Sequence, residues 1–168
     1  PNLEYHLQFI NMTFKNMHNK KSSNSGYFIS IAHKSTISKP LVSFIDCTLY
    51  NLEGNAQSGS VFGLWYKGGT NNNNMALIFT NCIFENMHYQ SDTTLCGGAV
   101  GFNYGTSIKN SHLTVTGSTF RNISSKHGGS AICYIVDSAQ LVVENNTFIN
   151  CRSLETSCVG GAIYIDFK

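Results

Sequence analysis

The sequence is poor in charge and in proline, and it has no long apolar run. Charged residues make up 12% of its 168 residues, about half the ~25% of an average soluble domain. The net charge is +2 and the longest basic cluster is the pair Lys20 and Lys21. We therefore expect no nucleic-acid binding through a charged face. No apolar stretch approaches the ~18 residues of a transmembrane helix, so we expect no membrane insertion by this segment.

The spacings typical of metal and catalytic sites are also missing. The six cysteines form no Cys-x-x-Cys pair, and no set of Cys and His residues has zinc spacing, so we expect neither a metal nor a cofactor. The nine acidic residues are scattered. They form neither the outward carboxylate pair of a glycoside hydrolase nor the Ca²⁺-binding cluster of a lyase. The sequence therefore predicts that the chain is not an enzyme.

What the sequence does contain is a repeat. Five similar segments begin 35, 35, 36 and 28 residues apart, a period in the range of solenoid repeats. Apolar residues occupy the first and third positions of each segment, which indicates a strand with one buried face. The segments are 7–17, 42–52, 77–87, 113–123 and 141–151.

A corner is expected in the middle of every segment. Each segment has a residue type there that tolerates a left-handed backbone: Asn11, Asp46, Asn81, Gly117 and Asn145. The next buried column lies five residues after the previous one, an odd step that a straight strand cannot keep on one face. That column is Phe14, Leu49, Phe84, Phe120 and Phe148.

An unbroken asparagine column follows two residues later. It consists of Asn16, Asn51, Asn86, Asn122 and Asn150. If neighbouring repeats stack about 4.8 Å apart, these side chains can donate hydrogen bonds to one another as an amide ladder. The alternative is that each asparagine only caps its own turn.

A third strand, opened by small residues, completes each repeat. These strands are expected within 25–31, 58–65, 97–102, 128–135 and 160–165. Three strands per repeat predict an all-β right-handed parallel β-helix, a solenoid of about five coils of three short strands. We expect one domain over 1–168. Because no polar cap follows the last coil, we expect it to belong to a longer chain or an end-to-end assembly.

Two glycine-rich motifs carry a family resemblance. The sequence GGAV at 97–100 and the sequence GGAI at 160–163 each follow a Phe and Asn motif. They resemble the repeats of the chlamydial polymorphic membrane proteins and, more broadly, the pectin-lyase-like β-helix repeats of bacterial and protist surface proteins. In this chain the Asn lies two residues after the Phe, whereas the chlamydial pattern has three. The resemblance covers nearly the whole chain and implies a β-helix.

Cysteines and glycosylation sequons favour an extracellular or cell-surface location. The sequons begin at Asn11, Asn122 and Asn145, which are the candidate N-glycosylation sites. Cys151 and Cys158 flank one loop and are predicted to form a disulfide. Cys47 and Cys82 lie in neighbouring repeats within disulfide range and are disulfide candidates. Because their Cβ bonds would be parallel, buried free thiols are the favoured interpretation. Cys96 and Cys133 remain unassigned.

Several outward positions of the first strand are apolar. Ile10, Ile45, Ile78 and Val142 form a candidate partner face. The partners expected are other copies of the chain or flanking coils of the same chain, with glycans as a further class. In the second strand, Glu85 and Arg121 share an outward column and are expected to form a surface ion pair.

These features predict a non-enzymatic structural or adhesive rod. The alternative is a carbohydrate-binding or polysaccharide-cleaving module of the pectin-lyase type. Trp65 and Tyr66 are the aromatic pair that could stack on a sugar ring.

Overall fold

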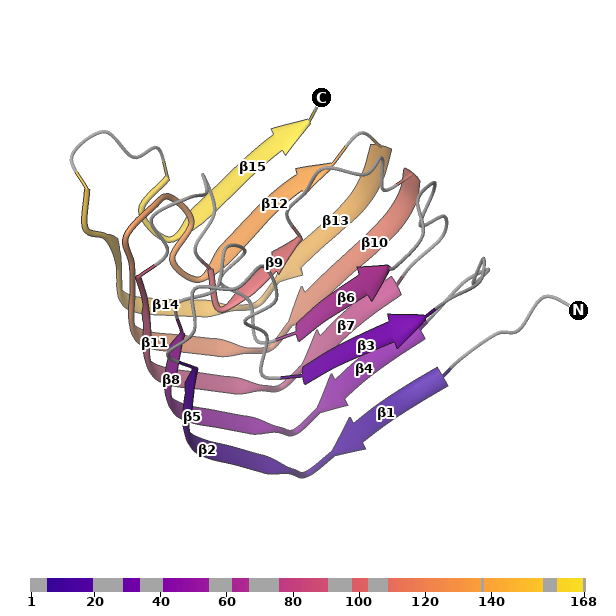
Figure 1. Cartoon of the computed structure of the whole chain (residues 1–168), viewed down its shortest axis with the longest axis horizontal. Coiled ribbons are helices and arrows are strands. Elements are labelled where there is room, and N and C mark those ends of the chain that lie inside the picture. The colour runs from indigo at the N-terminus through magenta and orange to yellow at the C-terminus, as the bar shows by residue number, and fades with distance from the viewer. Residues whose placement is uncertain are drawn as a thin grey trace, which may run out of the picture.

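The computed structural model describes residues 6–19, 29–33, 41–54, 62–66, 76–90, 98–102, 109–136, 138–155 and 160–167. This part of the chain contains fifteen strands and no helix. Each of the five repeats contributes three strands in succession, and all strand pairs are parallel. Figure 1 shows the repeats following one another from the N-terminal to the C-terminal strands.

The first strands of the repeats form one five-stranded sheet in the order β1-β4-β7-β10-β13. Its members are β1 (His6–Ile10), β4 (Leu41–Ile45), β7 (Ala76–Thr80), β10 (Lys109–Thr116) and β13 (Ser138–Glu144).

The second strands form another five-stranded sheet in the order β14-β11-β8-β5-β2. Its members are β2 (Thr13–Asn19), β5 (Thr48–Gly54), β8 (Ile83–Tyr89), β11 (Thr119–Ser125) and β14 (Thr147–Ser153).

The third strands are divided between two sheets, one with the order β15-β12-β9 and one pairing β3 with β6. β9 has three residues where the others have five, and within the described residues it pairs with β12 but not with β6. The members are β3 (Ile29–His33), β6 (Phe62–Tyr66), β9 (Val100–Phe102), β12 (Ile132–Val136) and β15 (Ile163–Phe167).

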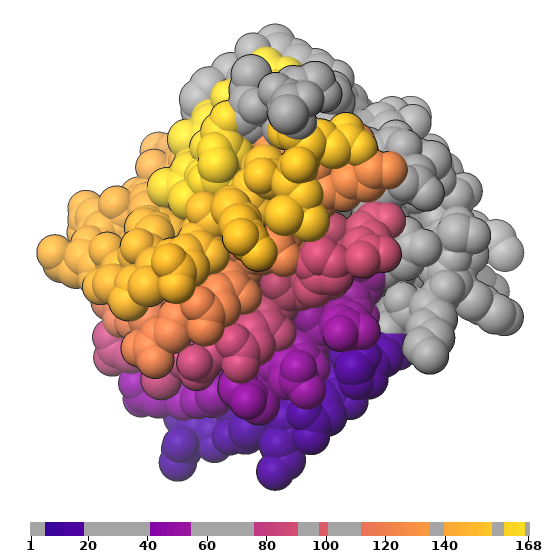
Figure 2. All heavy atoms as spheres, turned by 90° about the vertical axis from the view of Figure 1, so that its left-hand side faces the viewer, coloured from indigo at the N-terminus to yellow at the C-terminus, as the bar shows by residue number. Residues whose placement is uncertain are grey.

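The register follows the columns of the sequence alignment. Phe14, Leu49, Phe84, Phe120 and Phe148 are successive Cα partners across the second sheet. Leu7, Val42, Leu77, Leu113 and Leu141 are successive partners across the first sheet. Residues of one repeat therefore remain together in space, and Figure 2 shows the repeats as coloured bands in chain order.

Aromatic stacks fill the interior between the sheets. The rings of Phe84 and Phe120 are 4.5 Å apart and parallel within 1°. Those of Phe44 and Phe79 are 4.8 Å apart, and Phe79 meets Phe84 edge-on. These separations match the spacing between neighbouring strands of about 4.8 Å. In each stack, one side chain per repeat therefore fills the interior at the equivalent position.

The inward-facing side chains are fully buried in the middle repeats and only partly buried in the first and last repeats. Phe44, Phe84 and Phe120 are inaccessible to solvent, whereas Leu7 of the first repeat is 37% exposed. The inward residues Phe14 and Phe148 are also only partly buried. The two outermost repeats thus present apolar interior residues on their outer sides.

Candidate functional site

Five sharp corners join the first sheet to the second. The corner residues Asn11, Asp46, Asn81, Gly117 and Asn145 all have positive φ, between 50° and 60°. This is the left-handed region that the sequence predicted there, and that Asn, Asp and Gly tolerate best. Gly117 has an additional reason to be glycine, because a Cβ at this position would collide with Oδ1 of Asn81.

The asparagine column Asn16, Asn51, Asn86, Asn122 and Asn150 both bends the backbone and forms hydrogen bonds between repeats. Its φ angles lie between 52° and 56°. Asn51 Nδ2 donates to Asn16 Oδ1 at 2.8 Å, and Asn122 Nδ2 donates to Asn86 Oδ1 at 3.1 Å. Asn150 Nδ2 donates to Asn122 Oδ1 at 3.1 Å. These bonds at three of the four junctions share one direction, with the amide of the later repeat donating to the preceding one.

Polar side chains just after the first corner point inward and hold the backbone. The amide N–H of Cys82 donates to Ser118 Oγ at 3.0 Å, and that of Ser118 donates to Asn146 Oδ1 at 2.8 Å. Asn146 Nδ2 also donates to the carbonyl of Val115 at 2.7 Å. Sequence reasoning missed Ser118 and Asn146. The signal for them was the column just after the corner, which has a cysteine in repeats two and three and a polar residue in repeats four and five.

The structure corrects the predicted disulfide at Cys151 and agrees with the buried free thiols favoured at Cys47 and Cys82. Cys47, Cys82 and Cys151 are free thiols. Cys47 Sγ lies 3.3 Å from the Ile45 carbonyl oxygen, and Cys82 Sγ lies 3.4 Å from that of Thr80. The two occupy equivalent, in-register positions whose Cβ bonds are parallel, so each thiol hydrogen-bonds to backbone rather than to the other sulfur.

Cys151 Sγ lies 3.5 Å from the carbonyl oxygen of Phe120 in the preceding repeat. Its predicted partner, Cys158, is outside the described residues. Cys133, left unassigned by the sequence, is disulfide-bonded, and its partner is also outside the described residues.

The thiols of Cys82 and Cys151 are poor nucleophiles because burial raises their pKa values. Burial raises the pKa of Cys82 to about 11, although hydrogen bonding to the backbone of Cys47 and Thr80 lowers it. Burial also raises the pKa of Cys151. Because the thiolate is the reactive form, both side chains remain protonated at neutral pH and serve as packing groups.

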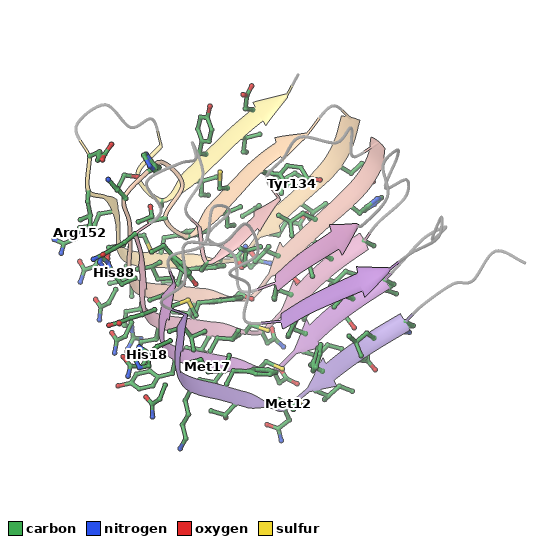
Figure 3. All side chains as sticks on the ribbon, in the orientation of Figure 1. Met12, Met17, His18, His88, Tyr134 and Arg152 are labelled. Atoms are coloured by element: carbon green, nitrogen blue, oxygen red, sulfur yellow. The ribbon has the colours of Figure 1, made fainter. Side chains whose placement is uncertain are left out.

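A column of polar residues runs along the outer face of the second sheet, next to the asparagines. It contains His18, Glu53, His88, Ser124 and Arg152, and Figure 3 shows His18, His88 and Arg152 on the same side. His18 Nδ1 lies 3.1 Å from Glu53 Oε2. Sequence reasoning did not identify this column.

His88 is fixed by two hydrogen bonds that define its tautomer. Gln90 Nε2 lies 2.7 Å from His88 Nε2, and His88 Nδ1 lies 2.5 Å from Ser124 Oγ. Because the amide nitrogen can only donate, His88 Nε2 accepts and Nδ1 carries the proton. His88 therefore donates to Ser124 and does not act as a base toward its hydroxyl in this arrangement.

The predicted ion pair joins neighbouring repeats beside this column. Arg121 Nη1 lies 3.6 Å from Glu85 Oε1 on the outer face. A second pair, Lys126 Nζ to Glu155 Oε1 at 3.4 Å, joins the fourth and fifth repeats. Exposed pairs of this kind contribute about 0–1 kcal/mol each, so they help align the repeats without forming a reactive centre.

The candidate partner face is less exposed than its sequence pattern suggests. Ile10 is 55% exposed, while Ile45, Ile78 and Val142 are only partly exposed. Ser43, which occupies the same column as Ile78 and Val142, is 4% exposed. Ile45 and Ile78 lie in strands flanked on both sides, which shields them, whereas Ile10 lies in the edge strand β1.

The three sequons differ in their surroundings. Asn11 and Asn145 are exposed corner residues. Asn122 is also exposed, but its Nδ2, the atom that would carry a glycan, donates to Asn86. The side chains of Trp65 and Tyr66 lie outside the described residues, although their backbone forms part of β6.

Comparison with known proteins gives no relative for this chain. No protein-family model, no curated protein and no solved structure matches it. Among the described residues, no group of three or more His, Cys, Asp and Glu side chains is arranged to hold a metal ion. The described part also has no helix long and apolar enough to cross a membrane.

Proposed function

We propose that the chain is a segment of a right-handed parallel β-helix that serves as a non-enzymatic structural or adhesive rod outside the cell or on its surface. The observation that carries this proposal is the asparagine column, in which side chains bond in one direction at three of the four junctions between repeats of the second sheet. Together with the in-register parallel sheets, it supports a solenoid that is rigid along its axis.

The rod role is supported by how the polar side chains are used. Asn146 and Ser118 bond to backbone groups of neighbouring repeats, and Glu85 pairs with Arg121 of the next repeat. Each of these side chains holds one repeat against another. In a scaffold of this kind, recognition lies in lateral faces and loops.

The alternative, a carbohydrate-binding or polysaccharide-cleaving module, is favoured by the outward polar column with Tyr50 beside it. Tyr50 is 39% exposed and could stack on a sugar ring. Incubation with uronate and neutral polysaccharides, followed by assays for new reducing ends and unsaturated products, separates the two functions. The rod predicts no product. Product formation that is lost in His88→Ala or Ser124→Ala would contradict it.

The extracellular location has a separate test at the sequons. After expression through a eukaryotic secretory route, peptide mapping is expected to find glycans at Asn11 and Asn145 and an unmodified Asn122. A glycan on Asn122 would replace one N–H of the nitrogen that bonds to Asn86 and would crowd that bond. Absence of any glycan on the secreted chain would contradict the location, and a fully modified Asn122 in folded protein would contradict the role of its amide.

A further inference from the structure

Each of the four junctions between successive repeats uses the same two backbone hydrogen bonds at the first corner. In the first of these bonds, the N–H of the corner residue donates to the carbonyl of the residue just before the corner in the next repeat, at 2.9 to 3.1 Å. The pairs are Asn11 to Ile45, Asp46 to Thr80, Asn81 to Thr116 and Gly117 to Glu144. In the second bond, the N–H of the residue two positions after the corner donates to the carbonyl of the residue just after the corner in the preceding repeat, at 2.8 to 2.9 Å. The pairs are Thr48 to Met12, Ile83 to Cys47, Thr119 to Cys82 and Thr147 to Ser118.

The two outermost repeats carry the unmatched halves of this junction. On the β13–β14 side, the equivalent groups are the N–H of Asn145, the carbonyl of Asn146 and Oδ1 of Asn150. On the β1–β2 side they are the carbonyl of Ile10, the N–H of Thr13 and Nδ2 of Asn16. Each donor on one side corresponds to an acceptor on the other, because the repeats bond with a fixed polarity.

The apolar surfaces of the two sides match in the same register. Phe14 and Phe148 occupy equivalent positions, and both are only partly buried although they pack on the core. Phe148 already stacks on Phe120 with ring centroids 5.1 Å apart and planes within 9°. A further phenylalanine could stack on its free side in the same geometry. Leu7 and Leu141 form a second equivalent pair of partly exposed residues.

We propose that the β13–β14 side of one molecule binds the β1–β2 side of a second copy of this chain, head to tail, with Asn16 Nδ2 of one copy donating to Asn150 Oδ1 of the other. The inference rests on the proposed β-helix and adds a partner to it. The hydrogen-bond polarity selects this pairing. Two identical sides brought together would not reproduce the directional set of donors and acceptors found at the internal junctions.

Asn16→Asp is the most selective test. The aspartate keeps the oxygen that accepts from Asn51 and tolerates the left-handed backbone, but it loses the donor and places a charge opposite Asn150 Oδ1. Sedimentation velocity over a series of concentrations is expected to show chains of the wild type that lengthen with concentration. The variant should need at least about tenfold more protein for the same degree of association. Ile83→Lys, on the exposed lateral face, is the matched control and should associate like the wild type.

A mixing experiment tests the direction of assembly. Phe14→Lys blocks one side and Phe148→Lys the other, so each variant alone should be monomeric. Because the two blocked sides carry like charges and repel each other, the mixture should give one-to-one dimers through the two intact sides. A wild type that remains monomeric at all concentrations would overturn the inference, as would dimers of either variant alone or loss of association in Ile83→Lys. Circular dichroism and small-angle scattering on the same samples show whether the β-rich rod is intact. A folded monomer contradicts this inference only, while an unfolded or globular chain contradicts the proposed function.

Discussion

At the scale of single residues, the fold depends on two left-handed positions in every repeat. Nine described residues other than glycine have positive φ, and every one is Asn or Asp. For other side chains this conformation costs about 1–2 kcal/mol per residue. The asparagines of the second position also bond across repeats, so one residue type performs two tasks there.

Asn122 is the best position to separate these two tasks. Its side chain donates to Asn86 and accepts from Asn150, and its φ is 53°. Asn122→Ala should lower the free energy of unfolding by about 2–4 kcal/mol, the sum of backbone strain and two lost hydrogen bonds. Urea unfolding followed by circular dichroism measures this loss.

Asn122→Gly is the control for the backbone contribution. Glycine tolerates the left-handed region, so this variant should be about 1–2 kcal/mol more stable than Asn122→Ala while still lacking the hydrogen bonds. Equal stabilities of the alanine and glycine variants would show that the left-handed backbone is not the reason for asparagine at this position.

Cys82 gives a prediction about pH. Burial raises the pKa of its thiol from 9.0 to about 11, so the folded chain keeps a proton that the unfolded chain loses between those values. Unfolding then releases a proton, and the free energy of unfolding should fall as pH rises from 9 to 11, by at most about 1.4 kcal/mol per pH unit from this group. Urea titrations at pH 8, 9 and 10 measure the slope.

Cys82→Ser removes the titrating group while retaining a donor for the Thr80 carbonyl, as Ser118 does for that of Thr116. Its stability should therefore fall less steeply with pH than that of the wild type. Buried Tyr89, whose pKa is also raised, contributes equally to both proteins. Identical slopes for the two proteins would contradict a buried, protonated Cys82.

The sequence predicted the structure more completely at the scale of strands and corners than at the scale of single residues or of the whole molecule. Apolar alternation located the first two strands of each repeat. The odd step between Phe79 and Phe84 required a corner between them, and Asn81 has the expected left-handed φ of 52°. The aligned columns are also the Cα partners of the sheets. The interruption between β6 and β9 was not predictable, because all five glycine- and serine-rich openings look alike.

The aromatic stack predicts how stability depends on position. Phe120 lies between Phe84 and Phe148 and is inaccessible to solvent, so Phe120→Ala should cost about 3–5 kcal/mol. Phe148 is already partly exposed, so Phe148→Ala should cost less than half as much. Denaturant titrations of both variants at low protein concentration give the comparison. Equal losses would mean that the last repeat is as well covered as the fourth.

At the scale of the whole molecule, a repeated sequence implies repeated neighbours, which is why the parallel arrangement could be predicted without coordinates. Interactions that depend on the direction of a side chain could not be predicted in this way. The contact between His88 and Ser124 arises because residues 36 positions apart share an outward column, and neither residue type signals it alone. The burial of Ser43 on a face expected to be open likewise needed the complete structure.

The central claim is that equivalent residues of all five repeats lie in register along one axis. Double electron–electron resonance between spin labels at Thr13→Cys and Thr147→Cys tests it most directly, in a background that lacks Cys96, Cys133, Cys151 and Cys158 and is diluted with unlabelled protein. Both positions are exposed and belong to one column of the second sheet. Four junctions of about 4.8 Å place their backbones about 19 Å apart. The account predicts a single narrow distance distribution between about 19 and 25 Å, and a broad distribution, or a mean beyond about 30 Å, would contradict it.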